Sequence, residues 1–322
     1  MLDTAQPASV LAEAFRLEVI AGLQGRPKQL SSRWLYDDAG SLLFERITGL
    51  QDYYPTRTET AILRRHADTM AGFIGEQAVL IEYGAGACIK TQILLDALRQ
   101  PAAYVPIDIS GDFLAQTAER LRGRYPQLDV QPVVADFTED FRFTARLPEG
   151  RRIAFFPGST LGNLDQGQAL ALLRRMRRHV GDDGRALIGV DLIKDTATLV
   201  RAYDDREGVT AEFNLNLLRR INRELRGTLP LEAFQHEARW NPYEMAMEMH
   251  LRCTSDVQAE VDGQPVSLQA GETIHTESSR KYDLRHITCL TESAGWRLAN
   301  FWTDDRRQFA VVGLEVVHRR GA

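Results

Sequence analysis

Small and acidic residues follow three successive apolar runs of this sequence, at the points where strands would give way to loops. Gly84 and Gly86 follow the first run. Asp108 ends the second run and Asp136 ends the third. Paired glycines let the backbone approach a ligand closely, and an acid about 20 residues after such a loop can accept hydrogen bonds from both hydroxyls of a ribose. Asp136 can accept one from an adenine amino group. The spacing therefore predicts a site for an adenosine-containing ligand.

The glycine loop lacks one feature of a dinucleotide site. A pyrophosphate-binding fingerprint needs a third glycine three residues after Gly86, and Ile89 occupies that position. A cofactor without phosphates fits better, and we expect S-adenosylmethionine. Lys90 either lies near the methionine carboxylate of that cofactor or is a solvated residue of the first helical turn. Phe137, next to Asp136, completes the predicted cofactor contacts. The simpler alternative, in which these residues only shape turns and helix caps, stays open.

A second loop follows the fourth apolar run, in the segment FPGSTLGNL at 156–164. Its glycines, among them Gly158, shape a loop at the same sheet edge and bring Thr160 and Asn163 within reach of the cofactor's methyl group. An asparagine amide has two donors and an acceptor, so it can hold an amine or a carboxylate. Asn163 can also simply cap or turn into the next helix.

Near the C-terminal end, Glu277 and Ser279 lie two residues apart, so on a strand they face the same side. A carboxylate accepts from a ring N–H and a hydroxyl donates or accepts, which suits recognition of an imidazole. The alternative is an ordinary polar strand face. His275 is expected to point to the other face or into a turn, and it is assigned no role.

The surrounding pattern predicts the elements that carry these residues. Apolar runs alternate with helical segments, which predicts a parallel sheet covered on both faces; the runs are 78–83, 103–108, 130–136, 152–157 and 186–192. Helices are expected at 90–98, 110–123 and 165–180. The predicted N-caps are Ser110 and Asp165 for the last two, and Ser9 for an N-terminal helix. Two helices over 196–226, short strands over 231–280, a helix at 283–295 and a final hairpin follow.

The predicted fold class is α/β: a doubly wound sheet of the class I methyltransferase type, with an antiparallel last strand, plus a second α+β lobe that binds substrate. The methyltransferase core is expected to comprise 61–195 and 284–322, and the second lobe 1–60 and 196–283.

Composition excludes several classes of protein. The chain has 322 residues and a net charge of −5, which argues against a nucleic-acid-binding protein. No apolar stretch approaches the roughly 18 residues that span a bilayer, so no membrane partner is expected. Three scattered cysteines and no secretory signal predict a cytoplasmic protein. The seven histidines show no ligand spacing, and we expect no metal.

Taken together, the motifs resemble the S-adenosylmethionine-dependent L-histidine Nα-methyltransferases of ergothioneine biosynthesis. The resemblance covers nearly the whole chain. It is carried by the glycine-loop segment 81–91 and by YDDAGSLLFERIT (36–48), YYPTRTE (53–59), PIDIS (106–110), FPGSTLGNL (156–164), YDDREGVTAEFNLNLLRRINREL (203–225) and IHTESSRKY (274–282).

The resemblance implies a role for each matching residue. Asn163 and Tyr203 would hold the carboxylate and amino group of histidine, and Glu277 and Ser279 would bind its imidazole. The pocket would be lined by Tyr36, Phe44 and Tyr53, and by Met249 or Met247, a register that the sequence does not fix. Tyr36 would also contact the cofactor.

The implied reaction transfers three methyl groups to the α-amine of free L-histidine and gives hercynine. Catalysis would rest mainly on Tyr36, Asn163 and Tyr203, and the proton would leave to a tyrosine such as Tyr36, to a carboxylate or to water. The chain is expected to act as a monomer. Alternatives are an N-methyltransferase for another amino acid or small amine, a regulatory protein that binds the cofactor without catalysis, and, less well supported, a nicotinamide oxidoreductase or a nucleic-acid methyltransferase.

Overall fold

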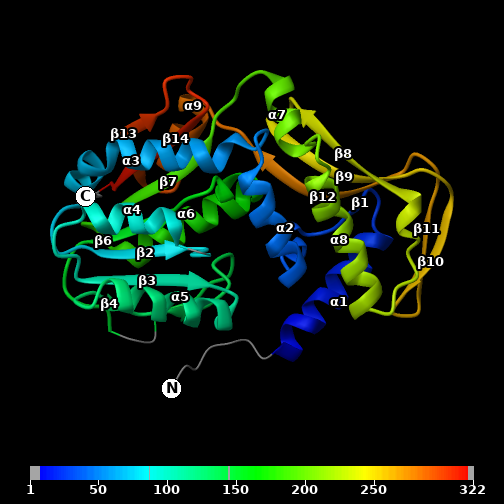
Figure 1. Cartoon of the computed structure of the whole chain (residues 1–322), viewed down its shortest axis with the longest axis horizontal. Helices are drawn as coiled ribbons and strands as arrows, with labels where there is room; N and C mark the ends of the chain where they lie inside the picture. The colour runs from blue at the N-terminus through cyan, green and yellow to red at the C-terminus, as the bar shows by residue number, and fades with distance from the viewer. Residues whose placement is uncertain (1–7, 87, 144–145, 318–322) are drawn as a thin grey trace, which may run out of the picture. The chain divides into compact units, whose positions relative to one another are not determined.

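The computed structural model of this chain describes residues 8–86, 88–143 and 146–317 and divides into two compact units (Figure 1). Unit 1 consists of Arg57–Leu192 and the chain from Tyr282 onward. Unit 2 consists of Gln6–Thr56 and Ile193–Lys281. Each unit has a hydrophobic core of its own.

Unit 1 is built on an eight-stranded mixed sheet. Its order is β13 (Trp296–Thr303), β14 (Phe309–Val316), β7 (Arg185–Asp191), β6 (Arg152–Phe156), β2 (Val79–Tyr83), β3 (Ala103–Asp108) and β4 (Asp129–Val130), with β5 (Val133–Val134) also paired to β3. The strands from β7 to β4 are parallel, whereas β14 runs antiparallel to both β7 and β13. This topology confirms the predicted class I methyltransferase-type sheet with its antiparallel last strand.

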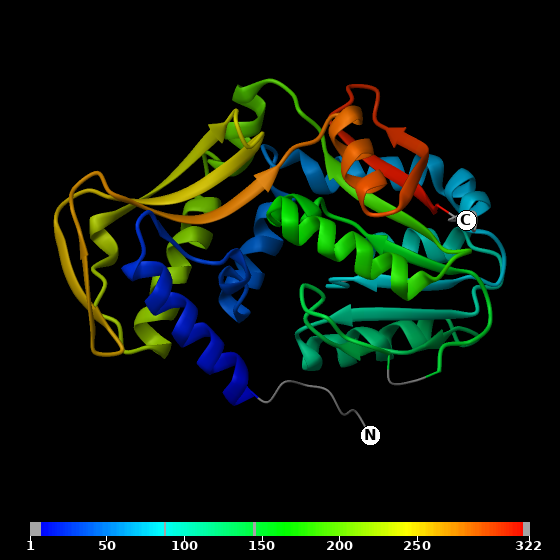
Figure 2. The same ribbon diagram turned by 180° about the vertical axis from the view of Figure 1, so that it is seen from behind.

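Helices cover both faces of this sheet, and the alternation of side chains along the strands explains why. In β2, Leu80 packs into the core formed with helices α3 (Tyr54–Ile74), α4 (Ile89–Ala97) and α5 (Gly111–Arg124). Its neighbours Val79 and Ile81 pack into the core formed with α6 (Gln166–Val180) and α9 (Leu284–Ser293). Figure 1 views the sheet from the side of α3, α4 and α5, and Figure 2 views it from the opposite side, where α6 lies. A strand buried on both faces needs mostly apolar residues, as β2 has apart from the buried Glu82, which accepts hydrogen bonds from the hydroxyls of Thr91 and Tyr104.

The predicted helix caps differ in outcome. Asp165 caps α6 in a full capping box: its carboxylate accepts from the backbone N–H of Gln168, and the Gln168 side chain accepts from the N–H of Asp165. Ser110 stands at the N-cap of α5, but its side chain makes no capping bond. Ser9 is not a cap, because α1 (Ala8–Gln24) begins one residue earlier.

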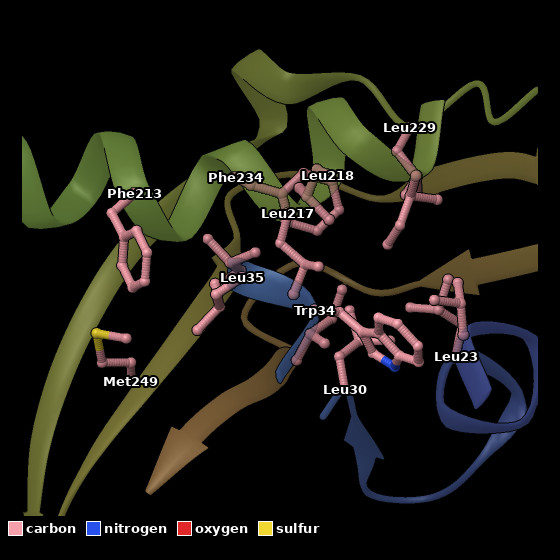
Figure 3. Packing of buried hydrophobic residues seen from close by; sticks show 14 of the residues in the cluster. Leu23, Leu30, Trp34, Leu35, Phe213, Leu217, Leu218, Leu229, Phe234 and Met249 are labelled. Atoms are coloured by element: carbon pink, nitrogen blue, oxygen red, sulfur yellow. The ribbon is translucent and has the colours of Figure 1, made fainter. Parts of the chain in front are cut away.

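Unit 2 combines a four-stranded sheet with helices. The sheet order is β1 (Lys28–Gln29), β12 (Thr273–Arg280), β9 (Ala246–Cys253) and β8 (Phe234–Asn241), and β10 (Val257–Val261) pairs with β11 (Gln264–Leu268). The helices are α1, α2 (Asp38–Gly49), α7 (Thr196–Tyr203) and α8 (Val209–Glu224), with short 3-10 turns η1 (Ser32–Leu35) and η3 (Leu231–Ala233). Leucines of α8 pack with Trp34, Leu35 and Phe234, and Phe213 of α8 points toward Met249 of β9 (Figure 3).

A bulge in β12 decides which residues face the core of unit 2. His275 pairs with His250, but two residues later Glu277 pairs with Met249, so Thr276 is the extra residue. An extra residue reverses the alternation of faces. His275 therefore lies on the face of His250, and Glu277 and Ser279 lie on the opposite face with the methionines.

The capping box of α6 gives a test of the fold. We expect Asp165→Ala to destabilise the protein by about 1 kcal/mol, because the backbone N–H of Gln168 loses the carboxylate that accepts from it. Asp182→Ala, at an exposed position just after the same helix, is the control and should stay within about 0.5 kcal/mol of wild type. Urea denaturation followed by circular dichroism measures both. Equal stability of the two variants would show that the box contributes nothing.

Candidate functional site

The glycine loop after β2 is tied to the end of β3. Gly84 and Gly86 both have positive φ, +70° and +47°, which other residues adopt at a cost. A Cβ on Gly84 would lie 3.3 Å from the ring of Phe137. The Gly84 N–H donates to the carbonyl of Ile107, and the Gly86 N–H donates to Asp108 Oδ2 at 3.2 Å. Unit 1 therefore brings four of the predicted cofactor residues to one edge of its sheet, with Asp108 holding the loop.

Both acids at this edge are oriented by neighbouring groups. Asp108 Oδ1 accepts from the N–H of Ser110 at 3.0 Å, just before α5 begins. Asp136 Oδ1 accepts from the N–H and the hydroxyl of Thr138. A carboxylate oxygen has two acceptor positions, so bonds of this kind orient Asp108 and leave it room for a ribose hydroxyl. An acid at this edge can therefore shape a turn and also bind a ligand, so the two interpretations given by the sequence are compatible.

Lys90 pairs with a buried acid that the sequence analysis missed. Its ammonium group contacts the carboxylate of Glu59, which is fully buried in α3. The same carboxylate accepts from the N–H of Gly158, at 3.0 and 2.9 Å for its two oxygens. Gly189 leaves the room for it, since a Cβ there would lie 2.0 Å from Glu59 Oε1. One carboxylate thus joins α3, α4 and the 156–164 loop, and the partner of Lys90 in the structure is this acid.

The remaining predicted residues of unit 1 sit in that loop. Thr160 and Asn163 begin and end the 3-10 turn η2 (Thr160–Asn163), and the Thr160 hydroxyl donates to the carbonyl of Pro157. Ser159 Oγ accepts from the N–H of Asp191 at 2.8 Å. The turn is therefore anchored at its start to β7, which fixes the loop that carries Asn163.

In unit 2, the predicted substrate residues gather on one face of β9 and β12. Glu277 stands opposite Met249, and Ser279 stands opposite Met247. Partners across a strand pair lie on the same face, so both methionines face the side of Glu277. The sequence left their register open, and the structure puts both on this face, with Met249 beside the acid.

Aromatic rings from α2, from α7 and from the segments just before α2 and α3 form a group in the same unit. The centroid of Tyr36 lies 5.4 Å from that of Phe44, Phe44 lies 6.2 Å from Tyr53, and Tyr53 lies 6.4 Å from Tyr203, all edge to face. Phe213, which the sequence analysis missed, lies 5.4 Å from Tyr36. Such rings present π faces that attract a cation at about 0.5–2 kcal/mol.

Glu277 is the most unusual group of this face. The residue is 7% exposed, and its Oε2 is buried without a hydrogen-bond partner in the part of the chain that the structure describes. Burial raises its pKa to about 7, opposed by the positive charge of Lys281. Because a buried acceptor without a partner is costly, native proteins retain one mainly where a ligand or function requires it.

Three polar side chains near this acid, Tyr203, Ser279 and Lys281, are hydrogen-bonded to one another, and among the described residues none of them bonds to Glu277 Oε2. The Tyr203 hydroxyl donates to Ser279 Oγ at 2.8 Å, and the buried Lys281 Nζ donates to both oxygens. Tyr36 is 39% exposed, yet the protein packed around its hydroxyl, together with the charge of Glu277, raises the pKa of that phenol well above its ordinary value. Tyr36 is thus held neutral.

Three functional residues escaped sequence reasoning, and the signals for them differ. Lys281 continues the alternation of Glu277 and Ser279, so the period of two places it on their face. Glu59 lies three residues before the buried Ile62, so a helix would place both on one face. This spacing is only a weak indication that Glu59 is buried. Phe213 looks like any core residue of an amphipathic helix, and the sequence carries no sign of its neighbours.

The fold and the two groups of side chains define an S-adenosylmethionine-dependent methyltransferase. The family model described as "Histidine-specific methyltransferase, SAM-dependent" matches residues 15–316. The chain belongs to this family of histidine-specific, S-adenosylmethionine-dependent methyltransferases.

Curated relatives agree over most of the chain. Histidine N-alpha-methyltransferase of Mycolicibacterium smegmatis is 38% identical over 94% of this chain and 95% of its own length. The protein of the same name from Mycobacterium tuberculosis is 40% identical over 92% of this chain and 94% of its own. Ergothioneine biosynthesis protein 1 of Neurospora crassa is 31% identical over 86% of this chain and 32% of its own.

Two further features are absent from the described residues. None of the helices combines the length and hydropathy that crossing a membrane requires. Within the same residues, no three His, Cys, Asp or Glu side chains are grouped as metal ligands.

The raised pKa of Glu277 gives a test without substrate. Between about pH 4.5 and 7 the folded protein keeps a proton on Glu277 that the unfolded chain releases, so this group's contribution to wild-type stability falls as the pH rises. Glu277→Gln cannot titrate. As the pH rises through this range, the free energy of unfolding of this variant should therefore increase relative to that of wild type, by on the order of 3 kcal/mol. Urea denaturation at a series of pH values measures the difference, and a difference that does not change with pH would contradict the buried acid.

Proposed function

We propose that this protein transfers three methyl groups from S-adenosylmethionine to the α-amine of free L-histidine, giving hercynine for ergothioneine biosynthesis. The observation that carries the proposal is the buried oxygen of Glu277, which has no partner among the described residues and lies on one face with Ser279. A ring N–H of histidine would satisfy this acceptor. The names of the two mycobacterial relatives support the α-amine as the site of transfer, and that of the fungal relative supports the pathway.

Unit 1 is proposed to hold the methyl donor, which supplies an electrophilic methyl group on its sulfonium when bound. The loop fits such a ligand, because Gly86 has no atoms within 4 Å of where a Cβ would stand and its backbone is therefore open to close approach. Asp108 would accept from the ribose hydroxyls, and Asp136 and Phe137 would contact the adenine. Lys90 would attract the methionine carboxylate while Glu59 keeps its ammonium group in place.

Unit 2 is proposed to hold the side chain of histidine. Glu277 and Ser279 would bind the imidazole, with Met249 and Phe44 packing on it. Tyr36, Tyr53 and Tyr203 would face the nitrogen that gains charge, where their rings favour a quaternary ammonium. Asn163, with Gly158 and Thr160 in the same loop of unit 1, would hold the amino and carboxylate groups.

Catalysis in this proposal is mainly positioning. The amine nitrogen must be held about 3–3.5 Å from the methyl carbon, in line with the bond that breaks. Asn163 and Tyr203 would fix this direction through hydrogen bonds. The neutral phenol of Tyr36 makes it a hydrogen-bond partner of the amine rather than the final proton acceptor, so we propose that the proton leaves to water.

The proposal also covers the cellular compartment and the oligomeric state of the protein. The cysteines Cys88, Cys253 and Cys289 are all free, which supports a reducing compartment, and we propose the cytoplasm. One chain supplies every residue of the proposed mechanism, so we propose that the protein acts as a monomer.

Product analysis tests the function. Purified protein is incubated with S-adenosylmethionine and a panel of free amino acids that includes histidine, tryptophan and tyrosine, and the products are weighed by mass spectrometry. We expect histidine to gain one, two and then three methyl groups, with fragments that place them on the α-nitrogen. Asn163→Ala should slow the reaction strongly. Methylation of another amine in preference to histidine, or of the ring instead of the α-nitrogen, would overturn the proposal.

A further inference from the structure

A buried lysine lies directly behind the proposed imidazole-binding pair. Lys281 is 1% exposed, and its ammonium group donates to Tyr203 Oη at 2.7 Å and to Ser279 Oγ at 2.9 Å. It also lies 4.6 Å from the centroid of the Tyr203 ring. A lysine is rarely buried this deeply unless specific partners hold it, and here the partners include two hydroxyls of the proposed substrate site.

The hydrogen bonds of Ser279 determine what it can offer a ligand. Its Oγ accepts one bond from Lys281 and a second from the Tyr203 hydroxyl, at 2.8 Å. A serine hydroxyl has two acceptor positions and one proton. Both acceptor positions are filled, so only the hydroxyl proton of Ser279 is available for a further hydrogen bond. Toward a ligand, Ser279 therefore acts as a donor.

Glu277 offers the complement. Its Oε2 is an acceptor without a partner among the described residues and lies on the face of Ser279. A ring held by both groups must therefore present a bare nitrogen to Ser279 and an N–H to Glu277. Neutral imidazole has one of each, whereas imidazolium has two N–H groups and no acceptor. A charged ring would place one of its N–H groups opposite the proton of Ser279. It would also bring a second positive charge near Lys281.

We propose that Lys281 is a positioning residue that holds Ser279 as a hydrogen-bond donor, so that the protein selects the neutral imidazole of histidine in a single tautomer. This inference rests on the proposed function and adds to it the state of the ring that binds. The same arrangement discriminates against an indole, which has a ring N–H but no ring acceptor for Ser279. Free histidine suits this site near neutral pH, because an imidazole with a pKa of about 6.5 is then mostly uncharged.

The first test uses the wild-type protein. Histidine labelled with ¹⁵N in the ring is bound in the presence of S-adenosylhomocysteine, and its nitrogen NMR signals are recorded. The inference predicts one protonated and one unprotonated ring nitrogen, fixed in one tautomer. Two protonated nitrogens, or rapid averaging between tautomers as in free histidine, would overturn it.

The second test is a double-mutant cycle on histidine affinity, measured by calorimetry with S-adenosylhomocysteine present. Lys281→Met should weaken histidine binding about ten- to a hundredfold and leave the Kd of S-adenosylhomocysteine unchanged. Ser279→Ala should weaken it in the wild-type background and much less in Lys281→Met, because the serine then no longer has a fixed direction. Additive losses would mean that Lys281 acts only on stability, and would contradict the inference.

Lys28→Met is the matched control. Lys28 is also buried in unit 2, at 6% exposure, but it donates to the carbonyl of Leu23 and touches neither hydroxyl. Its variant should bind histidine as wild type does. If Lys281→Met does not fold, the nitrogen signals of the wild-type complex decide the question. The product analysis distinguishes the two proposals. If histidine is methylated but binds with both ring nitrogens protonated, only the role of Lys281 is rejected. If histidine is not methylated, the proposed function is rejected.

Discussion

One acceptor atom governs the chemistry of unit 2. Glu277 Oε2 is buried in the folded chain, and among the described residues nothing donates to it. Burial favours the protonated form of this acid, which is why its pKa rises to about 7. An arrangement of this kind reduces stability, and in the proposed function the ring N–H of histidine supplies the missing donor. The aromatic group and the methionines would then give that ring an apolar surface to lie against.

Each unit contains a buried charged side chain that fixes polar groups of its proposed site. In unit 1, Glu59 holds Lys90 and the N–H of Gly158, so one carboxylate orients a cation and a loop. In unit 2, Lys281 holds the hydroxyls of Tyr203 and Ser279. A charge removed from water needs several good partners, and those partners are thereby held in one arrangement. A site assembled from such groups has little freedom to adapt, which favours selectivity for one small substrate.

The sequence predicts the parallel sheet well because strands buried on both faces are nearly continuous apolar runs, and here such runs alternate with helical segments. It also predicts that Glu277 and Ser279 share a face, since a period of two needs only their spacing. The face itself depends on the bulge at Thr276, and no residue type announces that bulge. Glu59, Phe213 and Lys281 were missed for a related reason: each has a contact with a residue far away in the sequence, such as Gly158 for Glu59, Tyr36 for Phe213 and Tyr203 for Lys281. The sequence did not fix whether Met247 or Met249 lines the pocket, and the pairing of β9 with β12 puts both on one face, so the choice of Met249 stays a prediction.

A crystal structure grown with L-histidine and S-adenosylhomocysteine tests the central claim most directly. The quantity to measure is the distance from Glu277 Oε2 to the nearest ring nitrogen of the bound histidine. The account predicts a hydrogen bond of about 2.7–3.2 Å, with the other ring nitrogen at Ser279 Oγ. A histidine whose imidazole lies elsewhere, with Oε2 bonded to water or to another protein group, would contradict it.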